Sequence, residues 1–208
     1  MPDPGLFSLF AKAALVGLLI AAPVGPIGLL TIRRTLEQGR DAGLATGLGA
    51  ACADALYGAV GAYGVSLVIE ALLQARLPLG LGGGALLMWL AWKGWHAPLA
   101  EQAAAAPGGT QLLASFLGTF ALTLSNPATI LSFLAVFASL AGDRQVQAPG
   151  LMVAGVWLGS AAWWLLLTAL VGRIGHRLDN RWRLRIQRGS SWLLAGFALW
   201  QWGQLLQG

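Results

Sequence analysis

The chain has 208 residues, of which 57% are hydrophobic and only 10% charged, and its mean hydropathy is +0.68. Soluble domains are usually about 45–50% apolar and about 25% charged, so this composition excludes an ordinary soluble protein and indicates an integral membrane protein. Thirteen Lys and Arg against eight Asp and Glu give a net charge of +5, a balance that would suggest nucleic-acid binding only in a soluble protein.

Six apolar segments are long enough, or nearly so, to cross a bilayer, which takes about 20 helical residues. In chain order they are residues 13–32, 42–69, 79–95, 112–140, 151–171 and 190–206. The sequence therefore predicts an all-α integral membrane protein that forms a single domain over residues 1–208. Residues 1–96 and 112–208 each hold three of the six predicted transmembrane helices, and residues 97–111 link them.

An odd number of spans makes the two halves enter the membrane from opposite sides, so we expect two inverted three-helix repeats. Short matches support this: "PIGLLTI" at 26–32 resembles "PATILSF" at 127–133, and "GLATG" at 43–47 resembles "GVWLG" at 155–159. The glycine pairs in the second match have the GxxxG spacing that lets two helices approach closely. They could join the two halves of one chain or two protomers of a homodimer.

The first and fourth predicted spans are interrupted near the membrane midplane, by Pro23, Gly25 and Pro26 and by Asn126 and Pro127. A proline inside a helix frees backbone groups, which a membrane tolerates where they are buried in protein or line a cavity. Asn126 is a good N-cap, and Pro26 and Pro127 suit a first helical position. We expect two half-helices whose N-termini face one point and bind an anion such as a carboxylate. Simple kinks in packed helices are the alternative.

Asp54 falls near the centre of the second predicted span, where a carboxyl group is costly and indicates a functional site. It could carry a coupling proton, bind a substrate ammonium group, or be a structural acid bonded to Ser, Thr or backbone. Tyr57, one helical turn later, is its candidate partner. The predicted substrate-binding residues are Pro23, Gly25, Pro26, Asp54, Tyr57, Asn126 and Pro127, with Asp54 as the coupling residue.

The basic residues predict the orientation of the chain. Ten of the thirteen fall after predicted spans one, three and five: Arg33, Arg34, Arg40, Lys93, Arg173, Arg177, Arg181, Arg183, Arg185 and Arg188. The positive-inside rule places these loops and the linker at 97–111 in the cytoplasm, and both termini outside. The basic run at 173–189 is interpreted as a topology determinant, and the alternatives are a site for anionic lipid or a regulatory arm.

No catalytic or metal-binding pattern is present in the sequence. His96 and His176 have no Cys or acid at ligand spacing, and Cys52 is the single cysteine. Nucleophile motifs and phosphate-binding glycine loops are absent as well. The sequence therefore predicts neither an enzyme nor a cofactor, metal or nucleic-acid partner.

The run "APVGPIGLLTIRRTLEQGRDAGLATGLGAACADALYG" at 22–58 and the run "TFALTLSNPATILSFLAVFASL" at 119–140 resemble the LysE-type translocator family of lysine and homoserine/threonine exporters. The resemblance lies at Pro23, Gly25, Pro26, Gly39, Arg40, Gly43, Gly49, Asp54, Asn126 and Pro127. It implies a six-span inner-membrane exporter of amino acids or related small solutes, driven by a proton or ion gradient. Many members carry Lys after Asn-Pro, and Ala128 at that position implies a different substrate preference or charge balance.

Other functions on the same fold remain open at this stage. They are an ion channel, a membrane scaffold that transports nothing, and an exporter of a non-amino-acid solute or of a metal ion. The lack of Cys, His and Met clusters disfavours the metal exporter.

Overall fold

The computed structural model describes residues 4–23, 25–63, 70–71, 74–97, 107–126, 129, 132–133, 148–175 and 178–207. Within these residues the chain forms helices and short connections, with no strand, which confirms the all-α prediction. The helices are α1 (Pro4–Ala21), α2 (Pro26–Gln38), α3 (Arg40–Ala62), α5 (Arg76–His96), α6 (Gly109–Leu124), α8 (Pro149–Gly175) and α9 (Asn180–Gln207).

Two of these helices, α3 and α8, are long and apolar enough to cross a membrane, and α1 and α2 together would make a third span, bent by 78°. Helix α6 is apolar but shorter. The six-span arrangement in two inverted repeats therefore stays a prediction. So does the matched pair of midplane breaks, because Pro127 and Ala128 lie outside the described residues, as do residues 98–106 of the predicted linker.

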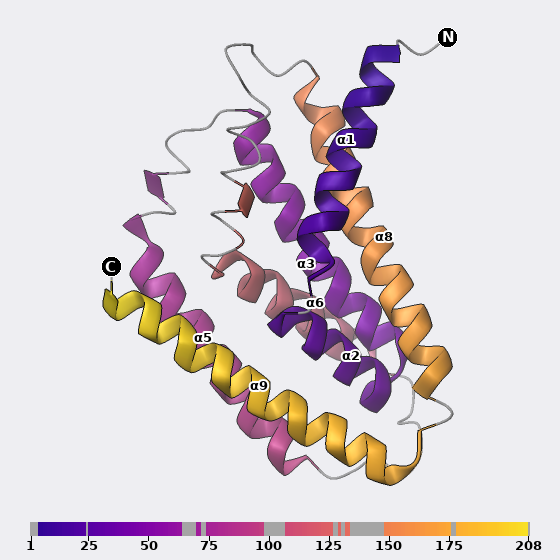
Figure 1. Cartoon of the computed structure of the whole chain (residues 1–208), viewed down its shortest axis with the longest axis vertical. Coiled ribbons are helices and arrows are strands. Elements are labelled where there is room, and N and C mark those ends of the chain that lie inside the picture. The colour runs from indigo at the N-terminus through magenta and orange to yellow at the C-terminus, as the bar shows by residue number, and fades with distance from the viewer. Residues whose placement is uncertain are drawn as a thin grey trace.

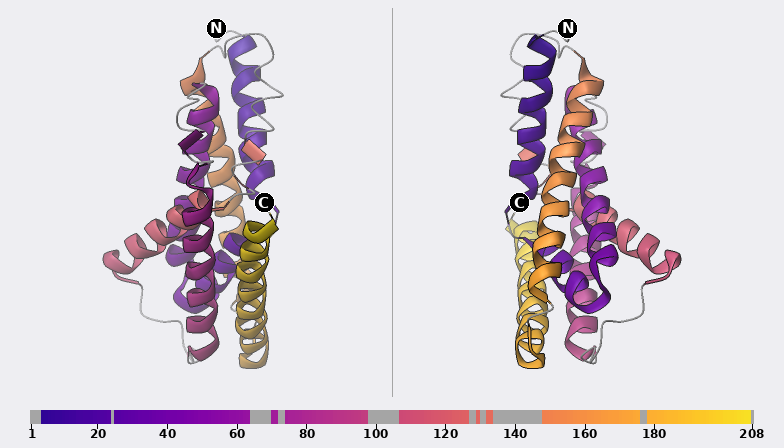
Figure 2. Two further views of the ribbon diagram at one scale, coloured as in Figure 1. Left: turned by 90° about the vertical axis from the view of Figure 1, so that its left-hand side faces the viewer. Right: turned by 90° about the vertical axis from the view of Figure 1, so that its right-hand side faces the viewer.

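Helix α8 is the element around which the first helices are arranged. It packs along both α1 and α3, while α5 packs against α9 and α6 against α3 (Figure 1). Helix α2 begins near the middle of the molecule, where α1 ends, and contacts α3, α8 and α9. Helix α6 leans away from the long axis that the other helices follow, as Figure 2 shows. Consequently α2 lies at the centre, with neighbours from both halves of the chain.

Glycines let α8 approach its neighbours at backbone distance. A side chain at Gly159 or Gly155 would run into the backbone of α1, around Ala14, and a side chain at Gly47 of α3 would run into Trp164 of α8. Both GxxxG pairs thus pack within the chain, which is the first of the two alternatives for them. A homodimer stays a prediction.

Several helices extend beyond the apolar segments that predicted them. Arg33 and Arg34, expected in a loop, lie inside α2, and α9 begins at Asn180 instead of residue 190. The reason is that Arg, Glu and Gln end an apolar run but are good helix formers, so the helix continues past the last apolar residue. Helix α5 includes Pro78 in its first turn, where no intrahelical N–H is needed.

We predict that Gly159→Ala destabilises the protein, because the added methyl group meets the carbonyl group of Ala14. Overpacking of this kind costs about 1–3 kcal/mol, which lowers the melting temperature by several degrees in a protein of this size. Gly172→Ala on the same helix is the matched control, since nothing lies within 4 Å of the added atom. Thermal unfolding in detergent measures both variants, and equal melting temperatures would contradict the close contact between α1 and α8.

Candidate functional site

Two adjoining cavities lie where α1 gives way to α2 and where α6 ends. The smaller, of about 90 Å³, contains Asp54, Thr123 and Trp164 in its lining and is called the polar cavity. The larger, of about 300 Å³, contains Leu87, Phe197 and Trp200 and is called the apolar cavity. The two cavities share Ile20, Pro23, Gly25, Pro26, Ile27, Asn126 and Thr129.

The beginning of α2 forms one wall of the polar cavity. Gly25 is the N-cap in an extended conformation, Pro26 is at the first helical position, and no side chain caps the helix. The first intrahelical bond runs from the N–H of Leu29 to the carbonyl oxygen of Gly25, at 3.0 Å. The N–H groups of Ile27 and Gly28 precede that bond and have no partner within the helix, and both residues line the cavity. This wall therefore presents the positive end of a helix dipole.

Asp54 contributes a carboxyl group to the lining of the polar cavity and is buried, with 3% of its surface exposed. The Ser160 hydroxyl donates to its Oδ2 at 2.7 Å, and the Trp164 indole N–H donates to Ser160 Oγ at 3.2 Å. An indole N–H can only donate, so the Ser160 oxygen accepts from Trp164 and directs its own proton to Asp54. Oδ2 is thereby an acceptor, and Oδ1, which has no hydrogen bond within the described part of the chain, is the oxygen more open to a proton or a cation.

Tyr57 is not hydrogen-bonded to Asp54 in the described part of the chain, and its place in the substrate site stays a prediction. Its hydroxyl donates to the carbonyl oxygen of Leu124 at 2.7 Å, and its ring stacks on Phe133 at 5.8 Å between centroids. Leu124 ends α6, where carbonyl groups lack an intrahelical donor, so they attract a buried hydroxyl from another helix. Tyr57 therefore positions the end of α6, immediately before Asn126, and does not line either cavity.

The structure brings most of the predicted site residues together. Pro23, Gly25, Pro26, Asp54 and Asn126 all line the polar cavity. They come from the α1–α2 junction, from α3 and from the residues after α6. Pro127 lies outside the described residues.

Two adjacent arginines, which the sequence analysis assigned to a loop, hold α2 in place. Arg34 Nη1 donates to Thr46 Oγ1 of α3 at 2.9 Å, and to the Ser115 carbonyl and Thr119 Oγ1 of α6, each at 3.2 Å. Arg33 is 7% exposed and forms an ion pair with Glu37 one turn later, with Nε 3.0 Å from Oε1. The spacing of Arg33 and Glu37 along a helix was the signal in the sequence that could have found this pair.

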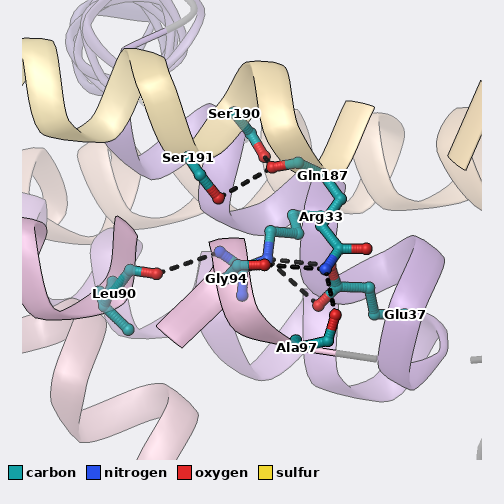
Figure 3. Close-up of polar contacts among 8 residues, drawn as sticks. All are labelled: Arg33, Glu37, Leu90, Gly94, Ala97, Gln187, Ser190 and Ser191. Carbon is teal, nitrogen blue, oxygen red and sulfur yellow. Dashed lines mark hydrogen bonds and ion pairs between the residues drawn. The ribbon is translucent and has the colours of Figure 1, made fainter. Parts of the chain in front are cut away.

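Figure 3 shows how the Arg33 side chain is held between α2, α5 and α9. Its Nη1 donates to the Leu90 carbonyl at 3.2 Å, and its guanidinium group fills the space beside Gly94 that a larger residue would occupy. Gln187 of α9 donates to the carbonyl groups of Gly94 at 2.8 Å and Ala97 at 2.7 Å. These contacts fix α2 to the α5–α9 pair.

We predict that Arg34→Met lowers stability, because it removes three hydrogen bonds from a charged donor and leaves their acceptors in α3 and α6 without it. A hydrogen bond to a charged group contributes about 1.5–3 kcal/mol. The three bonds share the two hydrogens of one nitrogen and are only partly buried, so their contributions do not add, and we expect a total loss on the order of 2–3 kcal/mol and several degrees in melting temperature. Arg181→Met, at an exposed position of α9, is the control with the same loss of charge. An unchanged melting temperature for Arg34→Met would show that its contacts do not hold α2.

Comparisons with known proteins identify relatives of the chain. The family model described as "LysE type translocator" matches residues 18–200. The "Chemotactic transduction protein ChpE" of Pseudomonas aeruginosa is 31% identical over 93% of this chain and 97% of that protein. The "Uncharacterized membrane protein YahN" of Escherichia coli is 30% identical over 77% of this chain and 74% of its own length.

A third kind of relative has a functional name. The "Threonine efflux protein" of Salmonella typhimurium is 27% identical over 93% of this chain and 97% of that protein. No solved structure matches the chain significantly.

Proposed function

Because the chain belongs to the LysE type translocator family, we propose that it is a secondary-active exporter of amino acids or related small solutes in the inner membrane. The family and the apolar helices make it a membrane translocator and not an enzyme. The threonine efflux relatives support export of a small solute. Beyond what the family membership shows, we propose the substrate class, the coupling ion and the orientation in the membrane.

The observation that carries the proposal is the pairing of opposite charges in the polar cavity. Asp54 and the uncapped start of α2 both line this cavity. A carboxylate attracts an ammonium group, and free N–H groups at a helix start attract a carboxylate. A free amino acid carries both groups on one carbon atom. We therefore place its ammonium group at Asp54 Oδ1 and its carboxylate at the N–H groups of Ile27 and Gly28, beside Asn126.

The apolar cavity supports a solute whose side chain is uncharged. Among the described residues that line the two cavities, Asp54 is the only ionisable one. A cationic or anionic side chain in the larger cavity would be desolvated without a partner of opposite charge, at a cost of several kcal/mol. Threonine, the solute in the name of several relatives, has a side chain without charge.

Asp54 is also the proposed coupling residue. Since Ser160 occupies Oδ2, a proton and a substrate ammonium group would compete for Oδ1. A proton that enters from outside would then displace the solute from Asp54. Loss of that proton to the cytoplasm would allow the next solute to bind. Such competition couples the two fluxes in opposite directions, as an exporter driven by the proton gradient requires.

The proposed topology is that of two inverted three-helix repeats, residues 1–96 and 112–208, with both termini outside and the linker at 97–111 inside. The basic positions support it. The α2–α3 junction, the ends of α5 and α8 and the start of α9, which carry most of the Arg residues, lie together at one end of the molecule (Figure 1). A second midplane break at Asn126 and Pro127 completes the proposal.

We predict that Asp54→Asn abolishes solute uptake driven by a pH gradient in proteoliposomes, because an amide can neither take up a proton nor attract an ammonium group. Uptake of labelled threonine, homoserine, serine, leucine and lysine is measured with the gradient imposed and with it collapsed. Glu70→Gln, at an exposed carboxyl group, is the matched control and keeps its uptake. Wild-type rates in Asp54→Asn would remove this residue from the mechanism, and flux without saturation would favour a channel.

We further predict that Ser160→Ala reduces the same uptake by about tenfold or more, because a hydrogen bond to a charged group is worth about 1.5–3 kcal/mol. Its control is Ser191→Ala, whose buried hydroxyl bonds only to the Gln187 carbonyl group in the described part of the chain. Equal uptake in the two variants would show that the Ser160 hydroxyl does not tune Asp54. Melting temperatures measured in parallel separate a loss of transport from a loss of folding.

A further inference from the structure

A third cavity, of about 340 Å³, lies at the end of the molecule opposite the start of α1, where α8 ends and α9 begins (Figure 1). Its lining includes Arg40, the first residue of α3, Arg173 in the last turn of α8, and Arg183 in the first turns of α9. Three arginines from three helices thus line one hollow, which we call the arginine pocket.

The charges in the arginine pocket are not balanced within the described part of the chain. No acidic residue lines it, and none of its three arginines forms an ion pair there. The nearest acids along the sequence are Asp41, which is exposed, and Asp179, which accepts the Trp182 backbone N–H at 2.9 Å. Like charges held together in this way repel one another and favour a bound anion.

Arg183 is held in place, while the other two arginines are free to reach a ligand. Arg183 Nη2 donates to the carbonyl group of Gly175, the last residue of α8, at 3.0 Å. Arg40 and Arg173 are exposed and have no hydrogen bond among the described contacts. A guanidinium group is planar and has several N–H donors, which suits the oxygens of a phosphate group.

The surface beside the arginine pocket indicates where that phosphate would come from. Leu166, Leu170 and Ile174 are spaced four residues apart on α8 and are 51%, 46% and 56% exposed. Arg173 is seven residues after Leu166, so it lies on the same helix face, at the end of this apolar stripe. Because α8 is long and apolar enough to span a membrane, the stripe is a surface for acyl chains. A headgroup above those chains would lie at Arg173.

We propose that the arginine pocket binds the phosphate-bearing headgroup of an anionic phospholipid, drawn from the leaflet that the positive-inside rule makes cytoplasmic. Basic pockets between transmembrane helices on that side are suited to anionic headgroups. The apolar stripe that adjoins the three arginines favours a lipid over a soluble anion, because a soluble anion would make no use of it. The site is separate from the two cavities around Asp54, with which it shares no lining residue.

The test is the melting temperature of the purified full chain in a zwitterionic detergent, titrated separately with phosphatidylglycerol, phosphatidylcholine and inorganic phosphate. Phosphatidylglycerol is expected to raise the melting temperature, and the other two are not. The Arg40→Gln/Arg173→Gln variant retains Arg183 and is expected to bind phosphatidylglycerol about 25-fold more weakly, since each basic residue contributes a factor of about five. Arg181→Gln/Arg185→Gln loses the same charge from α9 outside the pocket and is expected to behave as wild type.

Each other result would overturn the proposal. Equal weakening in both double variants would mean a diffuse charge effect and no site, and stabilisation by inorganic phosphate as strong as by the lipid would mean a site for a soluble anion. Should the pocket variant fail to fold, native mass spectrometry compares lipid retention by the wild type and by the single variant Arg173→Gln. Preferential retention of phosphatidylglycerol over phosphatidylcholine, lost in Arg173→Gln alone, supports the site, and equal retention contradicts it.

Discussion

The backbones of α3 and α8 pass close together, and the polar chemistry of the centre depends on that distance. Gly47 lets Trp164 lie against α3, and Gly159 lets α1 close on the other side of α8. Only with α3 and α8 this close does the Ser160 hydroxyl reach Asp54 at 2.7 Å. A larger residue at Gly47 would separate α3 from α8 and leave a buried carboxyl group without its donor, which would be more costly than the lost packing alone.

The two central cavities combine features that favour opposite environments. A carboxyl group and a free helix start attract charges, whereas Leu87, Phe197 and Trp200 line the adjoining space with apolar surface. Electrostatic attraction is stronger where water is excluded, so the polar groups act on a ligand with more effect than they would at the surface. The same environment penalises any charge without a partner, and the zwitterion with an uncharged side chain that we propose as the substrate would meet this balance.

The residues that sequence reasoning located correctly are those whose properties are local. A proline after a glycine suits a helix start whatever surrounds it, and α2 does begin at Pro26. An acid inside an apolar segment must be buried, and Asp54 is. The errors concern contacts between helices. Tyr57 bonds to α6, not to its helical neighbour, and Arg34 bonds both to α3 and to Ser115 of α6, 81 residues away along the chain. Spacing along one helix contains no information about which neighbouring helix a long side chain meets.

Arg33 and Arg34 give α2 two sets of attachments that point in different directions. Neighbouring residues on a helix are rotated by about 100°. Arg33 accordingly contacts α5, whereas Arg34 contacts α3 and α6. A rearrangement that moves α5 and α9 away from α3 and α6 must break one of these sets, because α2 cannot follow both groups. In the proposed export cycle, α2 would therefore move with the group of helices to which its arginine is bound more strongly, and the weaker of the two sets of contacts would break.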